Sequence, residues 1–417
     1  MVPSGWTRLP LEKIADVRSG VAKGKKGLKD PITVPYLRVA NVQDGHVNLD
    51  EVKEIEIERD KLERYSLKAG DVLMNEGGDF DKLGRGDVWL GQLQPCLHQN
   101  HVFAVRPNET TVDSFFLAAL AASNYGKTYF LSCAKRSTNL ASINSTQIKE
   151  FPVLLPPLPE QKKIAQILST WDQTITTTEQ LLANSQQQKK ALMQQLLTGK
   201  KRLHDQTGQP FTGEWQERSL DEIFSFKRGK GLSKGMVVES GVNKCVLYGE
   251  LYTKYPEVIG EIISRTDRCG GIPSMVGDIL IPSSTTTSGI DLANATAIME
   301  SGVLLGGDIN ILRPKILMSP EFMAHVLTHI KKYEIASRAQ GITIIHLYGS
   351  DLKGLKVQIP TIVEEQQKIA AVLTAADNEI DALKQKLDHL KQEKKALMQQ
   401  LLTGKRRVKP EAEMAEQ

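Results

Sequence analysis

The chain has 417 residues, enough for two or three domains of ordinary size, and 40% of them are hydrophobic, which excludes an intrinsically disordered chain. Its formal net charge of +4 is too small to decide for or against a nucleic-acid partner. The four cysteines form no C-x-x-C pair, and no apolar run reaches the roughly 18 residues of a membrane helix. We therefore expect a globular, cytoplasmic protein with free thiols, no metal site and no membrane segment.

The first predicted feature is a basic segment near the N-terminus. Between Arg18 and Lys29 the chain has five basic residues and no acidic one. Basic side chains without acidic neighbours suit phosphate oxygens, so we expect Lys23, Lys25 and Lys26 to contact DNA. A solvated loop would have the same composition, and this alternative is open at the level of sequence.

Two strands and a helix follow. GDVLM from Gly70 and HVFAVRP ending at Pro107 have the pattern of strands, and DSFFLAALAAS that of an amphipathic helix. The loop after GDVLM and the later KRSTN loop carry amide, hydroxyl and basic groups that can bond phosphates and base edges. Either loop could also be an ordinary solvated turn. The candidate DNA-binding residues in these loops are Asn75, Lys82, Arg85, Lys135, Arg136, Thr138 and Asn139.

A long helix is predicted from Glu160 to Thr198. Its apolar positions recur at alternating steps of four and three residues, from Ile164 to Leu196, which is the heptad pattern of a coiled coil. Several prolines precede the helix, and Gly199 suits a left-handed cap at its end.

The remaining half of the chain presents the same order of features. An acid-free basic segment runs from Lys227 to Lys234, GDILI begins at Gly277, and INILRPK and PEFMAHVLTHIKKY follow as a strand and a helix. A second heptad helix runs from Glu365 to the L-L-T-G-K that contains Gly404. The candidate DNA-binding residues here are Lys227, Arg228, Lys230, Lys234, Ser283, Ser284, Thr285, Thr286, Thr287, Arg338, Gln340 and Thr343.

The chain is thus an internal repeat. KKALMQQLLTGKKR begins at Lys189, and KKALMQQLLTGKRR begins at Lys394, roughly 205 residues later. The helices are nearly identical, whereas the globular parts have diverged, which indicates that the helices keep a shared role and the globular parts a varied one. We predict a target domain at 1–154, a helical spacer at 155–203, a second domain at 204–358, a second spacer at 359–407 and a polar tail at 408–417.

The length of the helices predicts their orientation. A helix of 39 residues spans about 58 Å, whereas the roughly 15 residues that follow Thr198 reach at most about 50 Å when fully stretched. Parallel helices would need a longer return than this segment allows. We therefore predict an α/β fold in which two α/β domains are separated by a pair of antiparallel coiled-coil helices, related by a pseudo-two-fold axis.

Motifs of catalysis are missing from the sequence. There is no G-x-x-x-x-G-K-[ST] phosphate loop and no N/D-P-P-Y/F segment of a DNA amino-methyltransferase. Asp44 with Glu51 and Lys53 faintly resembles a nuclease set, but such spacings arise by chance in charged chains. His101 and His346 have no visible triad partners. A stand-alone nuclease or methyltransferase is therefore disfavoured.

The P-L-P-E-Q-K-K-I-A opening from Pro157 and the L-L-T-G-K ending, both repeated, resemble the specificity subunits of type I restriction–modification enzymes. The second opening departs slightly, because Glu364 stands where the first has Pro159. The resemblance implies a non-catalytic subunit in which each domain recognises one half of a bipartite DNA target and the helices set the distance between the halves. The alternative is a coiled-coil scaffold without DNA readout.

The resemblance also implies partners. Two methyltransferase subunits that carry S-adenosylmethionine would dock around the helices. Motor–nuclease subunits that use ATP and Mg²⁺ would complete the restricting complex. None of these cofactors is expected on this chain.

Overall fold

The computed structural model describes residues 2–22, 27–78, 80, 83–138 and 140–409. The chain forms two compact units: unit 1 is Met1–Glu179 with Gln385–Gln417, and unit 2 is Gln180–Lys384. Each unit therefore contains one globular part and a portion of both long helices.

The central sheet of unit 1 is antiparallel, with the order β2–β10–β7. It confirms the strands predicted from GDVLM and HVFAVRP. The strands of this unit are β1 (Thr7–Pro10), β2 (Ala15–Ser19), β3 (Pro31–Leu37), β4 (Val42–Gln43), β5 (His46–Val47), β6 (Lys53–Glu58), β7 (Val72–Asn75), β8 (Gly77–Gly78), β9 (Leu97–His98), β10 (Val102–Pro107), β11 (Lys135–Arg136), β12 (Ala141–Ser142) and β13 (Pro152–Leu155).

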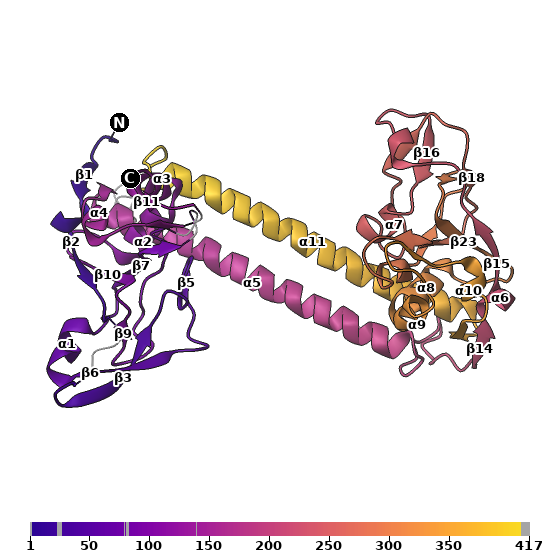
Figure 1. Ribbon diagram of the computed structural model, residues 1–417, viewed down its shortest axis with the longest axis horizontal. Coiled ribbons are helices and arrows are strands. Elements are labelled where there is room, and N and C mark those ends of the chain that lie inside the picture. The colour runs from indigo at the N-terminus through magenta and orange to yellow at the C-terminus, as the bar shows by residue number, and fades with distance from the viewer. Residues whose placement is uncertain (1, 23–26, 79, 81–82, 139, 410–417) are drawn as a thin grey trace. The chain divides into compact units, whose positions relative to one another are not determined.

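The core of unit 1 lies between this sheet and the helices that pack against it (Figure 1). Phe116, Phe130 and Phe151 are fully buried there. The helix that contains Phe116 begins where the side chain of Asp113 accepts a hydrogen bond from the Phe116 amide, which satisfies a free donor of the first turn. The helices of the globular part are α1 (Leu62–Tyr65), α2 (Ser114–Ala122), α3 (Asn124–Cys133) and α4 (Ser145–Lys149).

Unit 2 repeats this plan with an added strand. Its central antiparallel sheet has the order β15–β23–β19–β21, in which the first three strands correspond to β2, β10 and β7 of unit 1. The strands are β14 (Trp215–Ser219), β15 (Phe224–Arg228), β16 (Asn243–Val246), β17 (Ser264–Thr266), β18 (Ile272–Pro273), β19 (Asp278–Pro282), β20 (Ser284–Thr285), β21 (Thr296–Ile298), β22 (Leu304–Leu305), β23 (Ile309–Pro314), β24 (Ile345–His346) and β25 (Lys356–Pro360).

The helix predicted from PEFMAHVLTHIKKY is divided into three pieces in unit 2. It starts as an α-helix, passes through a π-helical turn, and resumes as a short α-helix. The helices of this globular part are α6 (Leu220–Ile223), α7 (Glu250–Thr253), α8 (Pro320–His325), the π-helical turn η6 (Val326–Ile330), α9 (Lys332–Ala336) and α10 (Gly349–Leu352).

The repeated G-D and R-P sequence elements form the same buried ion pair in both units. Arg106 donates two hydrogen bonds to Asp71, each of 2.7 Å, and Arg313 donates two to Asp278, of 2.8 and 2.7 Å. Both carboxylates are buried, so each pair joins neighbouring strands of a central sheet in bidentate geometry.

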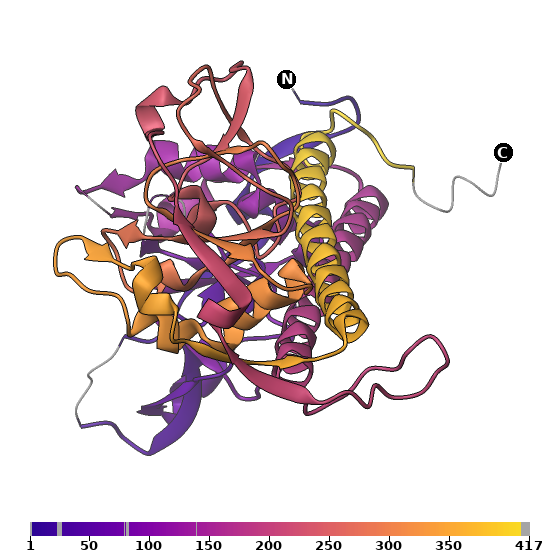
Figure 2. The ribbon, with the colours of Figure 1, turned by 90° about the vertical axis from the view of Figure 1, so that its right-hand side faces the viewer.

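The long helices are α5 (Leu158–Leu196) and α11 (Val363–Leu401), each of 39 residues. Every predicted heptad position in both helices is buried or half-buried, whereas most positions between them are exposed. The two helices run antiparallel in each unit, as predicted (Figure 2). In unit 1 Asp172 pairs with Lys394 and Glu179 with Lys391, and in unit 2 Lys189 pairs with Asp377.

The repeated E-Q dipeptide anchors each helix start. In unit 1 Arg407, which follows the end of α11, donates two hydrogen bonds of 2.7 Å to buried Glu160. The side chain of Gln161 accepts a hydrogen bond from the Asp113 amide and donates one to the Pro156 carbonyl. In unit 2 the corresponding bonds join Arg202 to Glu365, and Gln366 to Ser319 and Pro360.

Candidate nucleic-acid interface

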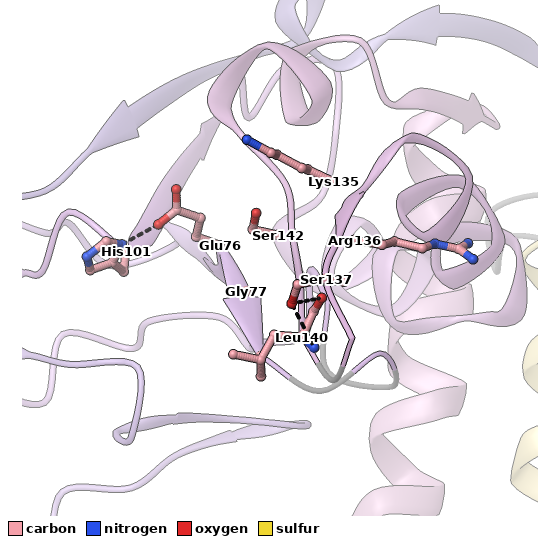
Figure 3. A pocket seen from close by; sticks show the side chains of 10 residues that line it. Glu76, Gly77, His101, Lys135, Arg136, Ser137, Leu140 and Ser142 are labelled. Carbon is pink, nitrogen blue, oxygen red and sulfur yellow. Dashed lines mark hydrogen bonds and ion pairs between the residues drawn. The ribbon is translucent and has the colours of Figure 1, made fainter.

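The two polar loops of the first domain, separated by about 60 residues of sequence, come together in unit 1. The segment after β7 continues as β8, which pairs antiparallel with β12 of the later loop through Ala141–Gly78 and Ser142–Gly77. The strands β11 and β12 form a hairpin beside it. Together they line an open hollow of about 500 Å³ (Figure 3). Its lining residues are Glu76, Gly77, Gly78, His101, Lys135, Arg136, Ser137, Leu140, Ala141 and Ser142.

Charged groups of both signs surround this hollow. Lys135 and Arg136 are exposed and point in opposite directions from their strand (Figure 3). Arg136 donates to the Leu131 carbonyl at 2.6 Å, and its guanidinium lies 6.0 Å from the centroid of the Phe80 ring. The ring of His101 contacts the Glu76 carboxylate. The hollow therefore offers cations, an acceptor and small hydroxyl groups to a polar ligand.

Unit 2 builds the same backbone arrangement from different residues. β20 pairs antiparallel with β24 through Ser284–His346, and Gln340 and His346 exchange two backbone hydrogen bonds of 2.8 and 2.7 Å. The amide of Ser283 donates to the Asp308 carbonyl at 2.8 Å. In unit 1 the amide of Glu76 donates in the same way to His101, at 2.9 Å. One backbone arrangement thus carries Glu76, His101 and Lys135 in one unit and Ser283, Asp308 and Gln340 in the other, although Ser283 is buried.

The basic segment of unit 2 reaches the same surface. Arg228, at the end of β15, lies 2.7 Å from Asp308 and stacks 5.8 Å from the centroid of the Tyr348 ring. The Tyr348 and His346 rings are stacked, with their centroids 5.9 Å apart. The planar groups of Arg228, Tyr348 and His346 are therefore stacked in a row next to the hairpin, and each is exposed or half-exposed.

A glycine at an equivalent place in each repeat holds the basic segment close to its neighbour. A Cβ on Gly229 would lie 1.9 Å from the Gly306 carbonyl oxygen, and one on Gly20 would lie 2.0 Å from the His98 carbonyl oxygen. No side chain fits at these distances, so the repeat requires glycine at both positions.

The structure exposes half of the predicted DNA-binding residues. The exposed ones are Lys135, Arg136, Thr138, Lys227, Arg228, Lys230, Lys234, Thr286, Thr287, Gln340 and Thr343. Five more, Lys23, Lys25, Lys26, Lys82 and Asn139, lie outside the described residues.

The other six predicted residues are buried or half-buried in this structure, and their contact with DNA stays a prediction. Ser283, Ser284 and Thr285 are buried beneath the hairpin, because β20 enters a sheet. Asn75 is buried and donates to the Val42 carbonyl at 2.8 Å. Two half-buried arginines bond within the protein: Arg85 donates to Gln43, and Arg338 donates to the Asp351 carbonyl.

The exposed hydroxyl loop of unit 2 is ordered by its own hydrogen bonds. The Thr285 hydroxyl lies 2.8 Å from that of Thr287, and Thr287 donates in turn to Asp291. The Thr287 and Ser288 bonds lower the pKa of Asp291, so this carboxylate stays charged and keeps the loop in place. Thr286 projects from an anchored loop.

Sequence reasoning missed the apolar and aromatic members of the surface. Ile342 is 99% exposed, Ile344 49% and Leu140 55%, and all three lie at the hairpins. Exposed large apolar side chains grouped in this way are typical of contact surfaces. Their position beside polar loops is the signal that the sequence contains. The sequence patterns indicate His346 only as a residue without triad partners, and they do not indicate Tyr348.

Comparison with known proteins assigns the family. The model of the type I restriction modification DNA specificity domain matches the chain twice, at residues 3–184 and 212–392. The chain belongs to this family. The resemblance drawn from the E-Q and L-L-T-G-K segments is thereby confirmed, and so is the two-fold repeat of the domain.

Relatives of this specificity-subunit family match over nearly the whole chain. A Methanocaldococcus jannaschii protein, provisionally named the type I restriction enzyme MjaX specificity subunit, is 27% identical over 427 residues, covering 98% of this chain and 95% of the relative. The MjaVIII specificity subunit of the same organism is 25% identical and covers 90% of this chain and 86% of its own.

Solved structures share the fold. The S subunit of a type I restriction–modification system from M. genitalium aligns with a TM-score of 0.57 at 16% identity, covering 96% of both chains. Among the helices of the described residues, none combines the length and the apolar character needed to cross a bilayer.

Proposed function

We propose that this chain is the sequence-reading subunit of a type I restriction–modification complex, and that each unit reads one half of a bipartite DNA target. One observation carries the proposal: both units hold a hairpin and a loop on the same backbone arrangement, yet place different side chains on it. This is the arrangement expected of two domains that approach a duplex in the same pose and read different bases.

The chemistry of the exposed residues suits DNA. Lys135, Lys227 and Lys230 can neutralise phosphates, which supplies affinity without sequence preference. Gln340 can bond adenine in bidentate fashion, and Thr286 can bond a base edge. The exposed isoleucine at position 342 suits the apolar methyl group of thymine.

We further propose that partner subunits supply all the catalysis. Two methyltransferase subunits would bind S-adenosylmethionine and dock around α5 and α11, and motor–nuclease subunits would use ATP and Mg²⁺. These assignments follow from the family, whose relatives are named as specificity subunits. We also propose that the complex acts in the cytoplasm, where the DNA lies.

Methylome sequencing tests this function in the host. DNA from cells with and without this gene is sequenced by a single-molecule method that detects methylated bases. We expect one bipartite motif to be methylated only when the gene is present. In parallel, the purified chain with its methyltransferase partner should retain duplexes that carry this motif over scrambled ones. Unchanged methylation together with equal retention would instead support a scaffold without DNA readout.

A further inference from the structure

Three side chains of the types that bind metal ions converge inside unit 2. They are Glu257, His325 and His329, whose ligand-type atoms all lie within 4.8 Å of one another. The Nε2 of His329 lies 2.5 Å from a carboxylate oxygen of Glu257. The two imidazole rings are nearly parallel, with centroids 5.9 Å apart. Two imidazoles and one carboxylate therefore share one small volume.

His325 has no partner that explains its burial. Its side chain is 1% exposed, and within the described part of the chain neither Nδ1 nor Nε2 has a hydrogen-bond partner. A buried polar group without a partner is costly, and most such groups in folded proteins bind another polar group, a water or an ion.

Both sides of the cluster are held by the segment 295–297, at the start of β21. The Ala297 amide of β21 donates to the Glu257 carbonyl at 2.8 Å. Next to His329, the Thr328 hydroxyl accepts from the Ala295 amide at 3.0 Å. The histidines themselves stand at the junction of α8 and the π-helical turn η6, and such turns are frequent at functional sites. The three side chains are therefore positioned before any ligand arrives.

The cluster is reachable and carries the charge that a cation needs. The side chains of His329 and Glu257 are 25% and 13% exposed, so one side is open to solvent. Glu257 supplies a carboxylate, which is the acidic group among the three ligands. Lys189 opposes a cation here, although its ammonium is paired with Asp377 at 2.5 Å.

We propose that Glu257, His325 and His329 bind a divalent transition-metal ion of the zinc type. Two imidazoles and a carboxylate form the ligand set of zinc sites that leave a fourth position for water, and imidazole selects zinc, copper or nickel over magnesium. Bonds of about 2.1 Å in a tetrahedral site place ligand atoms roughly 3.4 Å apart. Metal binding would therefore lengthen the 2.5 Å distance between Glu257 and His329 slightly, and it would shorten the longer distances among the three ligands.

This site differs from the sequence-based expectation of no metal, which depended on cysteine spacing. The H-x-x-x-H spacing of His325 and His329 was visible, but Glu257 is distant in sequence. A bound ion would tie the Glu257 segment to the helical stretch that leads, through α9, to the hairpin at Gln340. We therefore assign the ion a structural role that supports the hairpin.

The test is zinc titration of the full-length chain after removal of metals with a chelator. Calorimetry should show one Zn²⁺ per chain, and thermal unfolding should show a higher Tm with Zn²⁺ and no change with Mg²⁺. Glu257→Gln and His329→Gln should each weaken zinc binding by about tenfold or more while leaving the Tm of the metal-free chain near that of the wild type. His389→Gln, on the exposed face of α11, is the matched control and should bind zinc as the wild type does.

Two results would overturn the site. One is the absence of saturable zinc binding by the wild type. The other is undiminished binding by the double variant Glu257→Gln/His329→Gln. A His325 variant can fail to fold because this residue is buried. The test therefore uses variants of the two more exposed ligands, and circular dichroism checks that these variants are folded.

Discussion

At the scale of single residues, Lys230 is the clearest candidate for a phosphate contact, because it is exposed directly after Gly229 in the acid-free segment. Lys230→Ala should weaken binding to cognate and scrambled duplexes alike. The slope of log affinity against log salt should fall by about one, because one fewer counterion is released. The measurement is binding by the methyltransferase complex across a salt series.

The control for this lysine is Lys356→Ala, which removes the same charge from the β14–β25 pair, where no candidate residue lies. It should leave the slope unchanged. Equal slopes for wild type and Lys230→Ala would contradict a DNA contact by the basic segment. We would then assign this segment to the docking of partner subunits.

Thr286 should affect the preference for one DNA sequence over another, whereas Lys230 should affect the affinity for all sequences. It is exposed on a loop anchored by Thr287 and Asp291, so truncating it removes a hydroxyl without removing the loop. Thr286→Ala should lower discrimination at one base pair by about 1–3 kcal/mol. Competition between cognate duplexes and single-base variants measures this, and a uniform loss over all positions would contradict a base contact.

At the scale of elements, the buried ion pair at each helix start is the contact whose loss should reduce the free energy of unfolding most. Glu365 has no exposed side-chain surface, and Arg202 is its bidentate partner. Arg202→Ala leaves a buried carboxylate unpaired and should reduce the free energy of unfolding by about 3 kcal/mol. The double variant Arg202→Met/Glu365→Leu should recover most of this loss, since apolar replacements of both partners are often neutral.

Urea unfolding of these variants measures the difference. Lys353→Ala is the control, because its ion pair with Asp221 is more than half exposed on both sides and should contribute less than about 1 kcal/mol. A double variant as unstable as Arg202→Ala would show that the arginine contributes through its packing or its bond to the Gly213 carbonyl.

The antiparallel register of α5 and α11 permits a test of the proposed spacing role. Removing 179–185 together with 382–388 deletes one heptad from each helix while keeping the Asp172–Lys394 and Lys189–Asp377 pairs in register. The recognised gap should shorten by about 10 Å, roughly three base pairs. Methylome sequencing gives the gap directly.

Removing only 179–185 should disturb one set of ion pairs and impair assembly. An unchanged gap with full activity in the paired deletion would exclude the helices as the ruler.

At the scale of the whole molecule, the repeat predicts that the two halves read DNA independently. Exchanging residues 1–154 for the matching domain of a relative should change one half of the recognised motif, because the other unit keeps its own hairpin and loops. Exchanging 204–358 should change only the other half. The methylated motif is again the readout, and a change of both halves after one exchange would contradict independent reading.

The sequence by itself determined the repeat, the long helices and the family. These depend on local periodicity and on near-identical segments, which are visible without any tertiary contact. It also located the central strands, because GDVLM and HVFAVRP alternate between short polar turns and apolar runs. The division of one predicted helix by the π-helical turn at Val326–Ile330 was not visible, since the apolar pattern of this segment is that of a continuous amphipathic helix.

Only the tertiary structure decided which polar residues reach the surface. Ser284 and Thr286 are two residues apart in one hydroxyl-rich run, yet strand pairing buries the first and leaves the second exposed. The pairing of β20 with β24 joins segments about 60 residues apart, and the convergence of Glu257 with His325 and His329 joins segments about 70 residues apart. Composition cannot report such contacts, because they are set by which distant strands exchange hydrogen bonds and not by the residues along one segment.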